Sequence, residues 1–242
     1  MAKLKIHIVH ALQDNFVYIL SNAQGECAVI DPGDAAPVCE FLEREKLKLS
    51  LILCTHHHWD HTDGLGGLLE KFPVPVWASS GDSQKIKFPT VHVGEGHDYA
   101  VLGTNMRAIE VPGHTLGQVS YYFPEMQALF VGDTLFSCGC GRLFEGTYEQ
   151  LFGSLKKLAA LPPSTEIFFG HEYTLRSLQF LRDQGVTGSA IDEYEALCQR
   201  KQSAGEPTTP TTVARELELN PFLKAKDVDE LKKWREARNV WR

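Results

Sequence analysis

The stretch that decides the fold is Thr55-His56-His57-His58-Trp59-Asp60-His61, in which five of the seven side chains can bind a metal ion. It follows an apolar run, residues 50–54, that predicts a buried strand. His56 and His58 lie two positions apart, so an extended segment projects both imidazoles to one side and His57 to the other. Imidazole and carboxylate ligands together favour Zn²⁺, Fe or Mn²⁺ over Ca²⁺ or Mg²⁺. The segment therefore predicts a metal site beyond the end of a strand.

Apolar runs at three later places also end in a turn that carries a potential ligand, and these ligands are His114, Asp133 and His171. Functional side chains gather beyond strand ends, because the loops there are held by a rigid sheet and their side chains are not needed to fill the core. One catalytic ion needs about three protein ligands. The full set is too large for one ion and suits two ions that share a bridging carboxylate: His56, His58, Asp60, His61, His114, Asp133 and His171.

The order of the remaining patterns predicts an α/β body followed by helices. Strands are expected at 3–10, 16–20, 27–30, 50–54, 74–77, 106–111, 118–123, 127–131 and 165–169, and helices at 35–46, 64–71 and 148–160. From about residue 172 the periodicity is helical, at 173–184, 189–202, 212–219 and 227–238, without a strong strand candidate. We therefore predict two domains, residues 1–171 and residues 172–242.

The composition is that of an ordinary globular chain, with 43% hydrophobic residues and a net charge of −7. This acidic balance argues against nucleic acid or an anionic membrane as a partner. No apolar run approaches the roughly 18 residues of a membrane span, and the first residues lack the pattern of a signal peptide, so we expect a cytoplasmic location. The six cysteines form no CxxC motif and are expected to be free and reduced.

Residues 55–61 resemble the metal-binding signature of the metallo-β-lactamase superfamily, whose fold is an αββα sandwich. Longer segments narrow the resemblance: QDNF at 13–16, GHTLG at 113–117, GDTLFSCGCGRLFEGT at 132–147, GHEYT at 170–174 and NPF at 220–222. With them the chain resembles glyoxalase II, the hydroxyacylglutathione hydrolase family, over essentially its whole length. The resemblance implies an αββα catalytic domain at 1–171, a helical substrate-binding domain at 172–242, and two divalent metal ions per chain, with zinc favoured over iron or manganese.

The resemblance also implies a role for each candidate ligand and a reaction. The first ion would be held by His56, His58 and His114, and the second by Asp60, His61 and His171, with Asp133 as the bridge. The implied reaction is hydrolysis of S-(2-hydroxyacyl)glutathione, namely S-D-lactoylglutathione, to glutathione and D-lactate, the second step of methylglyoxal detoxification. The chain offers no GxSxG motif and no cysteine beside a base as another nucleophile. The candidate catalytic residues are Asp133, the bridge that the resemblance implies, and Asp60, which is hypothesised to carry a proton.

Glutathione carries two carboxylates, so its site needs cations. Residues 220–242 contain seven Lys or Arg and four Asp or Glu, a net charge of +3, while the rest of the chain carries −10. The helical phase of the last helix places Arg238 within its apolar face and Arg235 at the edge of that face. The resemblance implies that this pair binds the glycine carboxylate of glutathione. The other substrate contacts that it implies are Arg142, which like Arg238 stands where lysine is common, Phe144, which stands where tyrosine is common, and Tyr173.

Three other interpretations stay open at this point. A glutathione persulfide dioxygenase of the same fold would use a single iron and consume oxygen. A lactonase or β-lactamase would have no use for Arg235 and Arg238. A metal-binding or RNA-associated module would not need two differently composed ligand sets, and the RNA-processing members of the superfamily carry large inserted domains and basic grooves. We expect a monomer that acts on a small glutathione thioester, with Trp59 packing rather than reacting.

Overall fold

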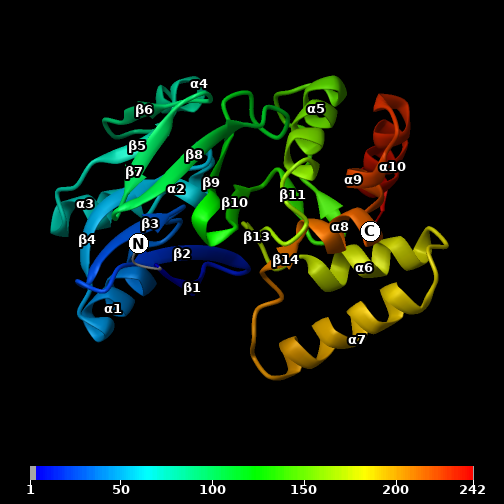
Figure 1. The fold of residues 1–242 in the computed structure, drawn as a ribbon, viewed down its shortest axis with the longest axis horizontal. Helices are drawn as coiled ribbons and strands as arrows, with labels where there is room; N and C mark the ends of the chain where they lie inside the picture. The colour runs from blue at the N-terminus through cyan, green and yellow to red at the C-terminus, as the bar shows by residue number, and fades with distance from the viewer. Residues whose placement is uncertain (1–3, 242) are drawn as a thin grey trace.

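The computed structural model describes residues 4–241, and within this range two six-stranded mixed sheets lie face to face (Figure 1). The first sheet has the order β1 (Lys5–Ala11), β2 (Asn15–Ser21), β3 (Glu26–Ile30), β4 (Lys48–Leu53), β5 (Val76–Ser79), β6 (Val91–Val93). The second has the order β14 (Thr211–Thr212), β13 (Glu166–Phe169), β10 (Ala128–Gly132), β9 (Val119–Phe123), β8 (Thr104–Glu110), β7 (Asp98–Val101). A separate hairpin pairs β11 (Leu135–Phe136) with β12 (Gly139–Cys140).

The alternation of side chains along β2 explains the layers. Phe16 and Tyr18 belong to the core between the two sheets, whereas Val17 and Ile19 belong to a second core under helices. Successive side chains of a strand point to opposite faces, so a strand that is apolar throughout must be covered on both. The helices that cover the first sheet are α1 (Ala35–Glu45) and α3 (Leu65–Lys71). The predicted αββα order is completed by α5 (Tyr148–Ala159) on the second sheet.

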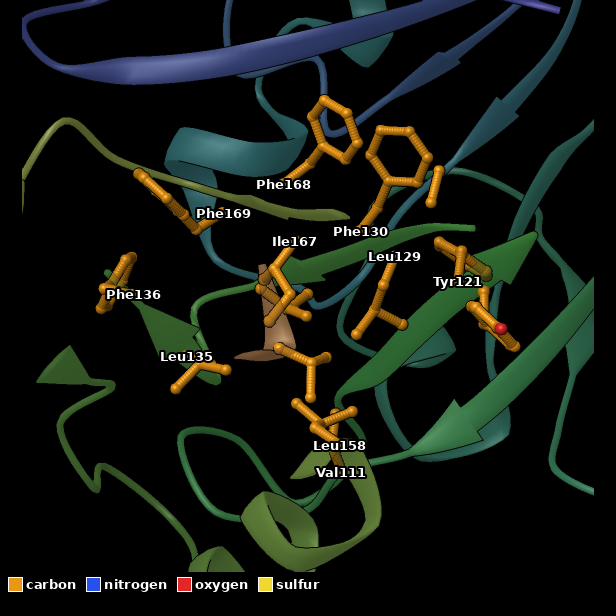
Figure 2. Close-up of a cluster of buried hydrophobic side chains, with 14 of the residues drawn as sticks. Val111, Tyr121, Leu129, Phe130, Leu135, Phe136, Leu158, Ile167, Phe168 and Phe169 are labelled. Carbon is orange, nitrogen blue, oxygen red and sulfur yellow. The ribbon is translucent and has the colours of Figure 1, made fainter. Parts of the chain in front are cut away.

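Figure 2 shows the same division within the second sheet. Phe130 and Phe168 point toward the first sheet and stack with their ring centroids 4.9 Å apart. Leu129 and Ile167 point the other way, toward Leu158 of α5. Burial of each such side chain contributes roughly 1.5–3 kcal/mol, so the neighbouring strands β10 and β13 form a rigid base for the loops that follow them.

The C-terminal part contains the helices α6 (Thr174–Asp183), α7 (Ser189–Ser203), α8 (Val213–Leu219), α9 (Pro221–Lys224) and α10 (Val228–Val240). It also contains β14, which pairs antiparallel with β13 and extends the second sheet. The expectation of a C-terminal part without a strand is therefore wrong, because a strand of two residues is too short to show alternation. Leu178, Phe222 and Leu231 join the same buried cluster as Leu129. The helices thus share the core of the sandwich, and the domain division at 171/172 stays a prediction.

Glu216 of α8 fastens the hairpin to these helices. Its buried carboxylate accepts hydrogen bonds from the hydroxyl of Ser137 at 2.9 Å and from the backbone N–H of Cys138 at 2.8 Å. Asn220, from the NPF segment, donates from Nδ2 to the carbonyl of Gly139 and to Glu216, both at 2.9 Å. The C-terminal helices therefore set the position of the hairpin, and the residues that follow the hairpin line the site described below.

The other differences from the sequence-based expectation concern short elements. Those missed are α2 (Trp59–Thr62), α4 (Ser80–Ser83), α9, a 3₁₀ turn (Pro124–Met126), and strands β6, β7, β11 and β12. Two to four residues are too few to show a period. Residues 1–3 and 242 of the expected elements and domains lie outside the described residues. Over residues 4–241, no helix is long and apolar enough to cross a membrane, and the six cysteines are buried and free, as expected.

Candidate metal centre

Four loops at one end of the sandwich bring the predicted ligands together. The loop after β4 carries His56 and His58, and α2 begins immediately after it. This turn of helix folds Asp60 and His61 back on the loop, since the backbone N–H of His61 donates to the carbonyl of His58 at 3.0 Å. The other ligands follow β8, β10 and β13, and they are His114, Asp133 and His171.

The first group of possible ligands is His56, His58 and His114. Nε2 of His56 lies 3.1 Å from Nδ1 of His58, and Nε2 of His114 lies 3.0 Å from the same atom. Three ring nitrogens that face one another this closely can all bind one cation at about 2.0–2.1 Å. The arrangement fits a single ion held by three imidazoles.

The second group is Asp60, His61 and His171. Nε2 of His61 lies 3.4 Å from Nε2 of His171, and Oδ2 of Asp60 lies 3.3 Å from the latter atom. Asp133 stands between the two groups: its Oδ2 is 3.5 Å from Nε2 of His114 and 3.3 Å from Nε2 of His171. A carboxylate in this position touches both groups, which is the geometry that a bridging ligand needs.

Two carboxylates that were not among the predicted site residues hold outward ring nitrogens. Asp31 lies 3.1 Å from Nδ1 of His61, and its carboxylate also accepts from the hydroxyl and the backbone N–H of Thr55. Asp14 lies 2.8 Å from Nδ1 of His171. The outward nitrogen of a metal-binding histidine is usually held in this way, which fixes the tautomer and directs the other nitrogen inward. Asp31 could have been found by the same signal as the ligands, because it directly follows the apolar run at 27–30.

The space between the ligands fits two ions. Oδ1 of Asp133 is buried and accepts no hydrogen bond from the described residues, which is costly unless a cation compensates it. A side chain at Gly170 would fill the space, because its Cβ would lie 2.4 Å from Oδ1 of Asp133 and 2.9 Å from Cε1 of His61. The donor set, the orphaned oxygen and the bare glycine together indicate a binuclear metal centre.

The two groups differ in charge. Burial, helped by the neighbouring imidazoles, lowers the pKa of His58 to about 4 and also lowers those of His56 and His114. Burial is the largest influence and opposes the charged form of His61 and His171, but the charge and hydrogen bonds of Asp133, together with Asp31 beside His61 and Asp60 beside His171, outweigh it and raise their pKa values to about 10 and about 12. The first group is thus neutral imidazole, whereas the second is surrounded by carboxylates that favour positive charge between them.

His57 points away from the ligands, as expected, but it has a partner of its own. Its backbone N–H donates to Oδ2 of Asp82 at 3.1 Å, and its ring Nδ1 lies 3.0 Å from the same oxygen. Oδ2 also accepts from the hydroxyl of Thr115 at 2.8 Å. The fully buried Asp82 therefore ties the His56–His58 loop to the residue after His114.

Trp59 does not pack, contrary to the expectation. Its side chain is 63% exposed and lines the mouth of the metal centre. Because His58 caps α2 and turns inward, the next side chain is directed to the outside. Phe144 lies on the same rim, 61% exposed, with its ring centroid 5.4 Å from that of His58.

A cavity of about 310 Å³ opens beside the metal centre, between the hairpin, α6 and α10. Phe136, Arg142 and Tyr173 line both the cavity and the metal centre, so the two are continuous. The ring of Tyr173 stacks on the ring of His171, 4.8 Å between centroids. This cavity therefore ends at the second group of ligands.

Arg235 and Arg238 both line the cavity, but their burial is the reverse of the expectation. Arg235 is 6% exposed, whereas Arg238 is half-buried. The reason is that the guanidinium of Arg235 donates to the backbone carbonyl of Cys140 at 2.7 Å and so lies under the hairpin. Helical phase alone cannot predict a contact with a distant part of the chain, such as Cys140.

The chain is similar to proteins of known families along almost its whole length. Residues 12–171 match the metallo-beta-lactamase superfamily, and residues 172–241 match the hydroxyacylglutathione hydrolase C-terminus. A hydroxyacylglutathione hydrolase of Chromohalobacter salexigens is 44% identical, covering 89% of this chain and 85% of that protein. One of Bdellovibrio bacteriovorus is 39% identical and covers 99% of both. Among solved structures, TTHA1623 in a di-iron-bound form aligns with a TM-score of 0.65 at 26% identity, covering 88% of this chain and 98% of that one.

Proposed function

The chain belongs to the hydroxyacylglutathione hydrolase family of the metallo-β-lactamase superfamily, and from this premise we propose that it hydrolyses S-(2-hydroxyacyl)glutathione thioesters. S-D-lactoylglutathione is the proposed substrate, and glutathione and D-lactate are the products of this second step of methylglyoxal detoxification. The observation that carries the proposal is the continuity of the binuclear metal centre with an arginine-lined cavity under the C-terminal helices. A thioester bound there would place its carrier in the cavity and its acyl carbon at the metal centre.

We assign the ligands of the two ions as the distances suggest. His56, His58 and His114 would hold one ion, Asp60, His61 and His171 the other, and Asp133 would bridge them. Zinc suits this set of imidazoles and carboxylates, and iron and manganese suit it as well. Asp31, Asp14 and the carbonyl of Arg142, which lies 2.7 Å from Nδ1 of His114, would keep the rings in place.

Two divalent cations, when bound, lower the pKa of water and polarise a carbonyl group. In the proposed reaction a C–O bond forms, the C–S bond breaks, and sulfur leaves as a thiolate. A thiol has a pKa of about 8.5, so the chain needs no strong general acid at the sulfur. Asp60 is the proposed proton carrier: its Oδ2 accepts from Nδ2 of Asn15 at 3.1 Å and faces His171.

The cavity would hold the glutathione moiety. Arg235 and Arg238 are the proposed contacts of the glycine carboxylate, and Tyr173 and Arg142 lie where the peptide would reach the metal centre. Phe144 has no hydroxyl and would contribute only an apolar face on the rim. From the sequence we also propose a cytoplasmic monomer, which size-exclusion chromatography and cell fractionation would test.

The test measures hydrolysis of S-D-lactoylglutathione together with the metal content of the same preparation. We expect turnover with close to two ions per chain, and loss of turnover in Asp133→Ala. Gly153→Ala serves as the control, because a Cβ there meets nothing within 4 Å. One iron per chain and consumption of oxygen would instead support a persulfide dioxygenase. Turnover of a lactone that is unaffected by Arg238→Ala would support a lactonase.

A further inference from the structure

The cavity beside the metal centre holds more positive charge than one carboxylate can neutralise. Four arginines line it: Arg142, Arg176, Arg235 and Arg238. No Asp or Glu lines the cavity, and in residues 4–241 none of these four guanidinium groups forms an ion pair. Arg182, on the same helix as Arg176 but outside the cavity, pairs with Asp192 and Glu195. The positive charge of the cavity is therefore not neutralised by any carboxylate of the described residues, which suits an anionic ligand.

Arg176 carries no signal in the sequence, and its place on α6 brings it into the cavity. Tyr173, Arg176, Ser177 and Phe180 all line the cavity. These positions are spaced by three, four and seven residues, so they share one face of the helix. Arg176 is thus presented on the same face as Tyr173, about one turn farther from the metal centre.

The guanidinium groups of Arg176 and Arg238 both lie near one aromatic ring. Their Cζ atoms lie 5.8 Å and 4.8 Å from the centroid of the Trp241 indole. That ring is fixed by its own Nε1–H, which donates to Asp183 at 2.8 Å. The like charges of Arg176 and Arg238 repel each other beside this fixed ring. Burial, together with the charges of Arg235 and Arg176, lowers the pKa of Arg238 to about 10. An anion between the two guanidinium groups would relieve this repulsion.

Arg235 is less available to a ligand than its neighbours. Nη1 donates to the carbonyl of Cys140 at 2.7 Å, and Nε donates to Oδ1 of Asn239 at 3.1 Å. It is almost fully buried, whereas Arg176 is exposed at the rim. The cavity thus has a deep cationic end at Arg235 and an outer one at Arg176, with Arg238 between them.

We propose that Arg176 is a specificity residue that binds the second carboxylate of the carrier, the α-carboxylate of its γ-glutamyl residue. This inference rests on the proposed function. The glycine carboxylate would take the deep end, at Arg235 and Arg238. The γ-glutamyl carboxylate would take the outer end, where its own ammonium group stays hydrated. The chain would therefore discriminate between glutathione thioesters and thioesters of the shorter thiol cysteinylglycine, which lacks that carboxylate.

The test combines two substrates with variants at one position. S-D-lactoylglutathione and S-D-lactoyl-cysteinylglycine are compared with the wild type, Arg176→Gln and Arg176→Lys. A hydrogen bond between charged groups is worth about tenfold or more in binding. We expect Arg176→Gln to raise KM for the glutathione thioester by about that factor with kcat unchanged, and to leave KM for the shorter thioester unchanged. Arg176→Lys should restore part of the loss, and Arg182→Gln is the matched control on α6.

The outcomes separate this inference from the proposed function. An equal change for both substrates, or no change for either, would overturn the role of Arg176. If the wild type hydrolyses neither thioester, the proposed function fails, and calorimetric titration with free glutathione and free cysteinylglycine still decides the matter. Arg176→Gln must then weaken binding of glutathione alone, and equal affinity in the wild type and the variant would refute the subsite.

Discussion

Replacing Gly170 with alanine is expected to disrupt the metal centre while leaving the fold intact. Gly170 lies between β13 and His171, and its φ is outside the left-handed region, so the backbone itself accepts an alanine. Its N–H donates to the carbonyl of Gly132 at 3.0 Å, and alanine can keep this bond. The effect therefore comes from the added methyl group alone.

The size of the effect follows from two distances. The new Cβ would lie 2.4 Å from Oδ1 of Asp133 and 2.9 Å from Cε1 of His61. Unstrained contacts are about 3.5 Å or longer, so Asp133 must move by about 1 Å and His61 by about half as much. Metal–ligand distances tolerate about 0.2 Å. We expect affinity for the second ion to fall by on the order of 100-fold, and overpacking to cost about 1–3 kcal/mol of unfolding free energy.

The assay is metal content after gel filtration, followed by competition of Zn²⁺ with a chromogenic chelator. Circular dichroism checks that the variant is folded. Gly153→Ala is the matched control: the position lies in α5 with nothing within 4 Å of the new Cβ, so it should gain about 0.5–1 kcal/mol of stability. If Gly170→Ala binds two ions with the affinity of the wild type, the space between Asp133 and His61 is not a metal site and the reasoning is refuted.

Three further changes test other parts of the structure. Asp82→Asn removes a charged acceptor from the link between His57 and Thr115, so affinity for the first ion should fall about tenfold. The absorption spectrum of the Co²⁺-loaded protein reports this loss of affinity. An unchanged spectrum and affinity would contradict the role of Asp82. Glu216→Ala removes the carboxylate that accepts from the hydroxyls of Ser137 and Thr211 and from the backbone N–H of Cys138. Unfolding in urea should show a loss of about 3 kcal/mol or more, and a loss under about 1 kcal/mol would mean that Glu216 does not hold the hairpin. Removal of metal by a chelator should lower the melting temperature, because an ion that binds only the folded state stabilises it. Added Zn²⁺ should restore the melting temperature. An unchanged melting temperature would contradict a metal centre that joins four loops.

The candidate ligands could be picked out from the sequence because they follow strands whose pattern is local. Residues 50–54, for example, are apolar and end in a turn, which is visible without any tertiary contact. Asp31 obeys the same rule, but a single aspartate in a turn is far more often a cap or a solvated surface residue than part of a metal site. Asp82 carries no such signal, since it lies in the short helix α4 and is defined only by what it touches.

The short elements and the cavity could not be predicted for a different reason. β14 consists of two residues, and its place in the sheet depends on Ile167, about 44 positions earlier in the chain. The burial of Arg235 depends on Cys140, and the exposure of Trp59 on the direction of the loop before it. Helical phase describes one element by itself and contains no information about the surface that it meets.

The sequence by itself indicated an α/β body followed by helices and a set of candidate ligands, because apolar runs and ligand types are properties of short segments, whereas the αββα layer order came from the resemblance to a known family. Only the tertiary structure decided which ring nitrogen of each histidine faces inward, and that Arg176 and Arg238 both lie near the same indole. The physical reason is distance along the chain. His58 meets His114, and His61 meets His171, only after the sheets have formed, and the orientation of such pairs is set by packing and hydrogen bonds that no single segment contains.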